Sequence, residues 1–126
     1  MAYILSTGVL AKHELNNFAI VEITNYGSTR KFFRVRFIDW TFRRPNRRRS
    51  NIDSLRPNRN ESAGIGIRKG VARYEIEIIV FDSVARKNEL VINCFGSTFR
   101  ELQLDARLLE GNTVLFKDLI LKRRRS

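Results

Sequence analysis

Hydrophobic and polar residues alternate along most of this chain, a pattern that indicates β-strands rather than helices. Residues 30–42 place phenylalanine and valine on one side of an extended chain and arginine on the other. Residues 72–81 repeat the pattern, with tyrosine and isoleucine opposite two glutamates. Because successive side chains of a strand point to opposite faces, each segment fits a strand that buries one face.

Further strand-like segments account for most of the remaining sequence. They are residues 17–24, 88–95, 98–108 and 113–121, with two weaker strands at 52–55 and 62–67. Residues 98–109 also fit a short helix, but their alternation favours a strand. Eight or nine short strands, with turn signals about every 8–12 residues, predict an all-β fold, an antiparallel β-sandwich of the jelly-roll type.

The length of 126 residues suits one domain with a single two-layer core. We divide it into residues 1–12, an N-terminal arm or first strand; residues 13–121, the sandwich with a basic loop at 43–59; and residues 122–126, a basic tail. No apolar run is long enough to predict a transmembrane segment. The N-terminus lacks the basic start of a secretory signal, so none is expected.

The N-terminal segment is apolar enough to need burial. It would either pair within its own domain as a first strand or extend as an assembly arm into a groove of a neighbouring copy. Both alternatives are open at this point. The residues that would make the contacts of the arm are Tyr3, Ile4, Leu5, Val9 and Leu10.

The formal net charge of +11 is concentrated in two short segments. Residues 43–59 hold seven arginines against one aspartate, and residues 122–125 hold four basic residues. The rest of the chain is nearly neutral, which argues against a protein that binds nucleic acid over its whole surface. The residues expected to contact a polyanion are Arg43, Arg44, Arg47, Arg48, Arg49, Arg123, Arg124 and Arg125.

The positions of the aromatic residues in segment 30–42 also help to decide whether the chain binds nucleic acid. A sheet that binds single-stranded nucleic acid needs aromatic and basic side chains on one exposed face. Here alternation separates most aromatic residues from the arginines, so we expect the aromatic residues in the core and the arginines on a polar face, paired with glutamates of residues 72–81. Only Phe32, Trp40 and Phe42 share the parity of the arginines. Trp40 and Phe42 either return to the core through a bulge or form an exposed apolar patch beside the basic loop.

Catalytic and metal-binding chemistry has little support in the sequence. A catalytic triad would have to use His13, the only histidine, which lies in a polar segment with no motif around it. A metal site built of histidines and cysteines is excluded because the chain has one of each, and no calcium-loop or dinucleotide-loop pattern is present. We therefore expect no enzyme activity and no cofactor. Cys94 is expected as a small buried residue, the alternative being a disulfide between subunits.

Six short segments, spread over nearly the whole chain, carry a resemblance. They are Ile4–Gly8, Asn17–Ile23 with the nearby Asn25, Phe37–Thr41, Tyr74–Ile78, Val91–Gly96 and Glu110–Lys117. These segments resemble small β-sandwich proteins of spore-forming Bacillus-like bacteria, including spore-surface proteins and, more distantly, endospore-appendage subunits. The resemblance implies a structural protein located on the spore surface or in an extracellular appendage.

The appendage subunits are jelly-roll domains that join sideways by sheet augmentation and lengthwise through an N-terminal extension. By resemblance, residues 2–10 would be the corresponding arm. This chain departs from that pattern because it has no cysteine before Cys94, and because the arginine-rich segments 43–49 and 122–125 are not expected of such subunits. Covalent cross-linking through the arm is therefore not expected, and non-covalent assembly is.

These observations lead to two functional hypotheses. The first is a non-enzymatic, self-assembling subunit of a fibre or of a cell-surface or spore-surface layer, a homo-oligomer joined by edge strands and the N-terminal arm. The alternative is a module that binds nucleic acid or another polyanion through the arginine-rich loop and tail. The two are compatible if the basic loop holds an assembled protein against an anionic surface.

Overall fold

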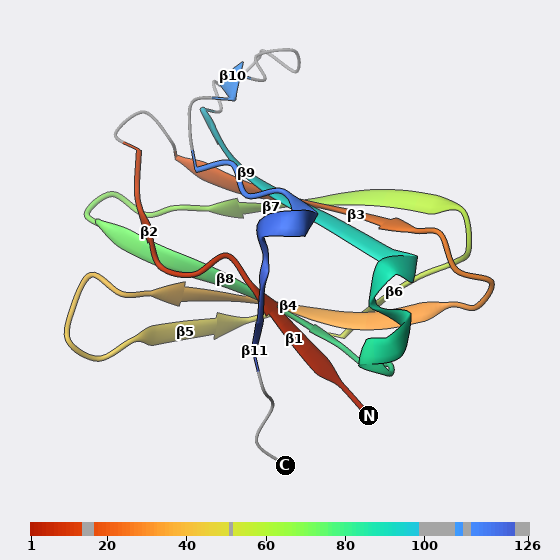
Figure 1. Cartoon of the computed structure of the whole chain (residues 1–126). Helices are drawn as coiled ribbons and strands as arrows, with labels where there is room; N and C mark the ends of the chain where they lie inside the picture. Colours follow the sequence, from red (N-terminus) through yellow and green to blue (C-terminus); the bar gives the residue numbers. More distant parts are fainter. Residues whose placement is uncertain (14–16, 51, 99–107, 110–111, 123–126) are drawn as a thin grey trace.

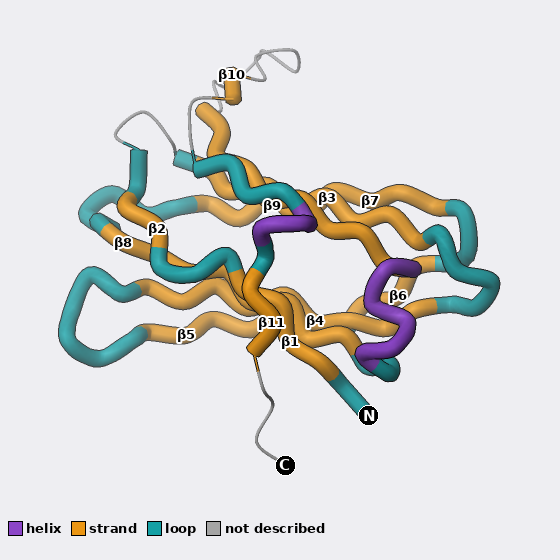
Figure 2. Tube along the Cα trace, in the orientation of Figure 1, coloured by secondary structure: helices purple, strands orange, loops and turns teal. Residues whose placement is uncertain are grey.

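A computed structural model describes residues 1–13, 17–50, 52–98, 108–109 and 112–122 of the chain. Two antiparallel sheets pack face to face, and the only helical elements in these ranges are the short 3-10 turns η1 (Val84–Glu89) and η2 (Phe116–Asp118) (Figures 1 and 2). The prediction of an antiparallel β-sandwich is confirmed.

The larger sheet has the strand order β11-β1-β8-β4-β5, with β2 also paired to β8 and β6 also paired to β4. The smaller sheet has the order β10-β9-β3-β7. The strands of the larger sheet are β1 (Tyr3–Ser6), β2 (Leu10–Ala11), β4 (Lys31–Asp39), β5 (Asn46–Arg49), β6 (Asp53–Leu55), β8 (Arg73–Val80) and β11 (Ile120–Lys122). Those of the smaller sheet are β3 (Phe18–Asn25), β7 (Arg59–Gly66), β9 (Leu90–Thr98) and β10 (Leu108–Leu109).

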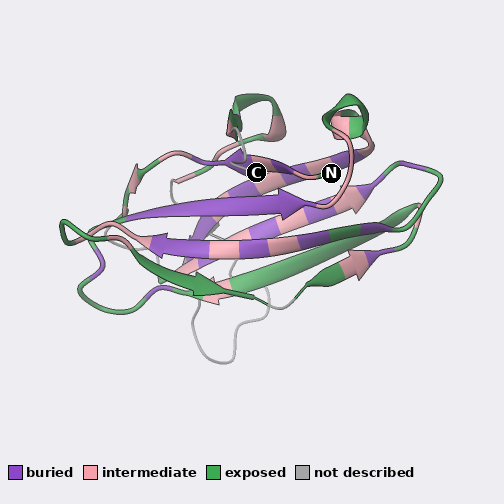
Figure 3. Ribbon diagram, turned by 90° about the horizontal axis from the view of Figure 1, so that it is seen from below, coloured by how far each residue is buried: buried purple, intermediate pink, exposed green. Residues whose placement is uncertain are grey.

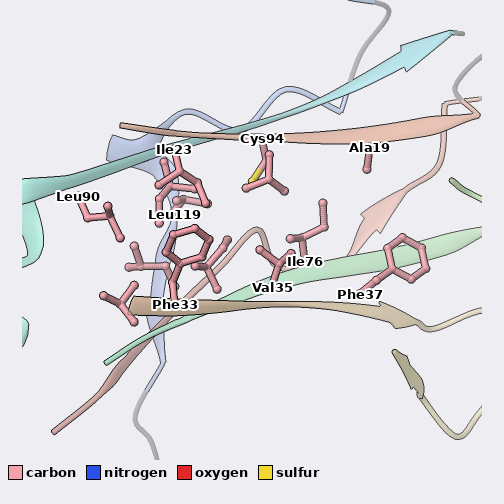
Figure 4. Packing of buried hydrophobic residues seen from close by; sticks show 14 of the residues in the cluster. Ala19, Ile23, Phe33, Val35, Phe37, Ile76, Leu90, Cys94 and Leu119 are labelled. Atoms are coloured by element: carbon pink, nitrogen blue, oxygen red, sulfur yellow. The ribbon is translucent and has the colours of Figure 1, made fainter. Parts of the chain in front are cut away.

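The core lies between the sheets and follows the alternation of β4, β8, β3 and β9. Phe33, Val35 and Phe37 of β4 point toward Ala19 of β3 and Cys94 of β9 (Figure 4). The residues that alternate with these on β4, β8 and β3 face away from the core. The prediction that the phenylalanines of segment 30–42 are buried is confirmed for Phe33 and Phe37, as is the burial of Cys94.

The N-terminal segment forms a strand of its own domain in this structure. β1 lies between β8 and β11, with Tyr3 opposite Val80 and Leu5 opposite Ile78. Tyr3 and Leu5 are both buried in the core. The alternatives for this segment were a first strand of its own domain and an extended arm, and in this structure it is the first strand.

Two regions differ from the predicted elements. The segment expected as a basic loop at 43–59 also contains strand β5, which was not predicted and which pairs with β4 in register. β6 lies within the weaker strand predicted at 52–55 and pairs with β4 as well. The strand predicted at 113–121 is instead a bridge between Val114 and Cys94, followed by η2 and β11. The side-chain oxygen of Asn93 accepts the N–H of Phe116 over 3.0 Å at the start of that turn. Of the strand predicted at 98–108, residues 99–107 lie outside the described ranges.

Candidate functional site

β7 is the edge of the smaller sheet, and it is exposed along nearly its whole length (Figure 3). It pairs with β3 over eight residues on one side, from Phe18 opposite Gly66 to Asn25 opposite Arg59. Within the described residues no strand pairs with its other side. An unpaired edge of this length presents a row of N–H and C=O groups to another chain.

The hydrogen bonds at the ends of β3 fix which groups of β7 point outward. The N–H of Ile67 donates to the carbonyl of Asn17 over 2.8 Å, and the N–H of Tyr26 donates to the carbonyl of Glu89 over 2.7 Å on the opposite side of β3. Since an antiparallel ladder alternates, the backbone groups of odd-numbered β7 residues such as Ala63 face β3. The groups of even-numbered residues such as Ser62 face outward.

A cleft of about 480 Å³ opens between the two sheets beside β7. Its apolar floor comes from the inner face of β4, and its sides come from β5, the segment before β6, and β7. The residues that define it best are Phe33, Val35 and Phe37 on the floor, Arg48 and Ile52 on one side, and Ile65 on the other. The core is therefore incompletely covered at this edge of the sandwich.

Within the described residues, the other sheet edges are less suited to pairing with a further chain. The described parts of β11 and β10 contain three and two residues. β5 is longer, but three of its four residues are arginines. Short edges and charged edge residues are two ways in which proteins prevent unwanted strand pairing. β7 instead carries small residues, including Ala63 and Gly64, in its central part.

The residues predicted for an assembly arm have different environments. Tyr3 and Leu5 lie in the core, Ile4 and Leu10 are partly buried, and Val9 is exposed. The segment thus uses its apolar side chains within its own domain in this structure.

The two aromatic residues of the predicted patch also differ. Phe42 has 76% of its surface exposed, whereas Trp40 is partly buried and donates from Nε1 to Oε1 of Glu75 over 2.9 Å. The structure therefore ties Trp40 into a polar network and leaves Phe42 in solvent.

The arginines of segment 43–49 do not form one cluster. Arg43 and Arg44 are exposed in the turn before β5, and the other three lie on the strand. The predicted contacts Arg123, Arg124 and Arg125 of the tail lie outside the described residues.

On β5 the arginines alternate between two faces. Arg47 is opposite Ile38, and Arg49 is opposite Arg36, on the outer face of the larger sheet. Arg48 is opposite Phe37 on the inner face, and its guanidinium carbon lies 5.6 Å from the centre of the Phe37 ring. This division follows from the register of β5 on β4, which the sequence pattern alone had not revealed.

The outer face of the larger sheet also carries a buried polar network around two glutamates of β8. Glu77 contacts Arg36 at 3.3 Å and Lys122 at 2.6 Å. Glu75 accepts from Lys122 at 2.8 Å, and from Ser6 and Trp40. The predicted pairing of strand arginines with these glutamates is confirmed for Arg36, but both glutamates are buried rather than solvated.

The network keeps Glu75 ionised. Burial acts to raise the pKa of its carboxyl, but hydrogen bonds from Lys122, Ser6 and Trp40 outweigh burial and hold the pKa below its ordinary value. The same contacts hold the pKa of Lys122 above its ordinary value, although burial acts in the opposite direction. Both carboxylate oxygens of Glu75 are thus engaged in a structural role.

A second buried charge lies at the start of β4. Lys31 is only 3% exposed, and its ammonium group contacts Asp82 at 2.7 Å and Glu89 at 2.8 Å. Burial opposes its charge, but the hydrogen bonds to these carboxylates raise its pKa above the ordinary value. This contact connects the larger sheet to the turn that leads into the smaller sheet.

No group of three or more potential metal ligands occurs among the described residues. Nor does any helix in the described part reach the length and apolarity required to span a membrane. Comparison with protein-family models, with curated proteins and with solved structures found no match.

Proposed function

We propose that this chain is a structural β-sandwich that self-associates without covalent cross-links, as a subunit of a fibre or surface layer. The observation that carries the proposal is the unpaired eight-residue edge of β7 beside the open apolar cleft. The edge and the cleft lie side by side, so one added strand would pair with the outward backbone groups of β7 and cover the cleft at the same time.

A strand added to β7 would use the outward backbone groups of its even-numbered residues. Its side chains that point toward the larger sheet would then lie over the cleft, above Phe33, Val35 and Phe37. Backbone hydrogen bonds would supply affinity, and the cleft would supply specificity, as in other cases of strand addition. The burial of apolar surface would favour the associated state.

The proposal assigns the contact to β7 rather than to the N-terminal arm. Withdrawing β1 from its own sheet would expose Leu5 and Tyr3 and would remove the pairing of β1 with β8 and with β11. An edge contact at β7 requires no such rearrangement. The absence of covalent linkage in the proposal rests on the burial of Cys94, the only cysteine of the chain.

The test compares two proline variants of β7 by light scattering on a sizing column and by electron microscopy. Ser62→Pro removes an N–H that faces outward, so it should abolish association and leave the monomer folded. Ala63→Pro removes an N–H that faces β3, so it should lower thermal stability instead. A wild-type protein that remains monomeric at all concentrations would overturn the proposal, as would unchanged assembly of Ser62→Pro.

A further inference from the structure

Four arginines gather on the outer face of the larger sheet, on the adjacent strands β4 and β5. Arg34 and Arg36 alternate along β4 on the side away from the core. Arg49 is directly opposite Arg36, and Arg47 is two positions along β5 on the same face. Like charges at directly opposed positions of an antiparallel pair repel each other.

The carboxylates of this face do not neutralise the group. Glu77 pairs with Arg36 and is shared with Lys122, and Glu75 is occupied by Lys122. Among the described residues Arg34, Arg47 and Arg49 make no ion pair. An excess of positive charge therefore remains at the β5 side of the face.

Two of these arginines also have a side-chain donor that makes no hydrogen bond. The Nε atoms of Arg34 and Arg36 are buried and have no hydrogen-bond partner in the structure. Buried polar groups are paired in the great majority of cases, so an unpaired donor invites an explanation. Because these Nε atoms are buried, an oxyanion over β4 and β5 would contact the other nitrogens of the guanidinium groups.

We propose that this face binds the phosphodiester backbone of single-stranded nucleic acid. The planar guanidinium group matches the geometry of phosphate oxygens and makes two parallel hydrogen bonds to them. Side chains two apart on a strand are about 7 Å apart, and those on adjacent strands are about 5 Å apart. The four arginines thus form a compact block that several neighbouring phosphates could contact at once.

An exposed aromatic ring lies on the same face and favours a single strand over other polyanions. Phe32 precedes Arg34 by two positions on β4 and has 47% of its surface exposed. Single-strand binders combine basic side chains for the backbone with aromatic rings on which bases stack. This activity is separate from self-association at β7, because the two surfaces belong to different sheets.

Arg48 provides a matched control within the same strand. It has the same charge as Arg47 and is also exposed, but its register position places it on the inner face over Phe37. If binding depended only on the total charge of the protein, loss of Arg47 and loss of Arg48 would weaken it equally. If the outer face is the binding site, only the loss of Arg47 should weaken binding.

The experiment measures fluorescence anisotropy of a labelled oligothymidylate of about 20 nucleotides, a length above the site size of most single-strand binders. Titrations of the monomeric protein, at concentrations below those of self-association and at about 50 to 200 mM salt, give the slope of log affinity against log salt, to which each neutralised phosphate of a single strand contributes about 0.7. Arg47→Ser should reduce the magnitude of the slope by about 0.7, whereas Arg48→Ser should leave it unchanged. Thermal melts of both variants verify that they are folded.

Two further binding measurements, one with oligothymidylate and one with heparin, identify the class of ligand. Phe32→Ala should weaken oligothymidylate binding about tenfold with no change in salt slope, since this variant removes stacking and keeps the charge. It should leave binding to heparin, a sulfated polysaccharide, unchanged. Absence of oligothymidylate binding at low salt, equal effects of Arg47→Ser and Arg48→Ser, or binding to heparin alone would each overturn the proposal.

Discussion

The ammonium group of Lys31 lies 2.7 Å from Oδ2 of Asp82 and joins the first residue of β4 to the turn after β8. Lys31 is 3% exposed and Asp82 is 16% exposed, so the pair is largely removed from water. A second cation, Arg86, contacts the other oxygen of the same carboxylate at 3.3 Å and is 56% exposed. Asp82 thus has one buried and one exposed partner, which allows their contributions to be compared.

We predict that Lys31→Ala lowers the free energy of unfolding by about 2–4 kcal/mol, because it leaves a largely buried carboxylate without its main partner. Arg86→Ala removes an exposed partner of the same carboxylate and should cost at most about 1 kcal/mol. Urea denaturation at neutral pH measures both. Equal losses for the two variants would contradict the structural distinction between them.

The lowered pKa values of Glu75 and Asp82 predict acid sensitivity. For both groups burial acts to raise the pKa, but hydrogen bonds, chiefly from Lys122 and from Lys31 respectively, hold it below the ordinary value. A carboxyl group with a lower pKa in the folded state binds fewer protons than in the unfolded state. The stability it contributes is therefore complete well above pH 4 and is lost as pH falls through about 4 toward the lowered folded pKa.

The check is a series of urea denaturations between about pH 7 and pH 2. The free energy of unfolding should fall below about pH 5. Glu75→Gln should be less stable at neutral pH and should show a shallower acid decline, because one of the two titrating groups is gone. An acid profile of Glu75→Gln that runs parallel to that of wild type would exclude Glu75 as a contributor.

The strands that form the core were predictable because their signal is local. The alternation in segments 30–42 and 72–81 assigned Phe33 and Phe37 to the core and Arg36 to the face shared with the glutamates of β8. Both assignments hold in β4 and β8. A period of two residues is sufficient for this, since it depends only on the geometry of a single strand.

Features that depend on pairing between distant segments were not predictable. The burial of Glu75 requires Lys122 of β11 and Ser6 of β1, which come from opposite ends of the chain. Similarly, the separation of Arg47 from Arg48 onto two faces requires β5 to be a strand in register with β4. The sequence pattern showed only a run of arginines around Pro45, which is also typical of a basic loop.

The thiol of Cys94 is predicted to be unreactive in the folded protein. Burial raises its pKa to about 12, so almost no thiolate is present at neutral pH. A disulfide-exchange reagent should label Cys94 only as fast as the protein unfolds, and labelling should accelerate in urea. As a control, Val9→Cys in a Cys94→Ala background places a thiol at a site that is 52% exposed and should react directly. Rapid labelling of native Cys94 would indicate that the core opens readily, and would again allow a disulfide between subunits.

The position of β1 leads to a prediction that separates the two alternatives for the N-terminal segment. Leu5 is 1% exposed in the core of its own domain and lies opposite Ile78. Leu5→Ala should therefore lower the free energy of unfolding of the monomer by about 2–5 kcal/mol, the usual cost of truncating a buried leucine. Val9→Ala, in the same segment but 52% exposed, should change it by less than about 0.5 kcal/mol. Both are measured by urea denaturation at a concentration where the protein is monomeric. If the segment instead served as an arm that is buried only in a neighbouring copy, Leu5→Ala would leave the monomer unaffected and would weaken association alone.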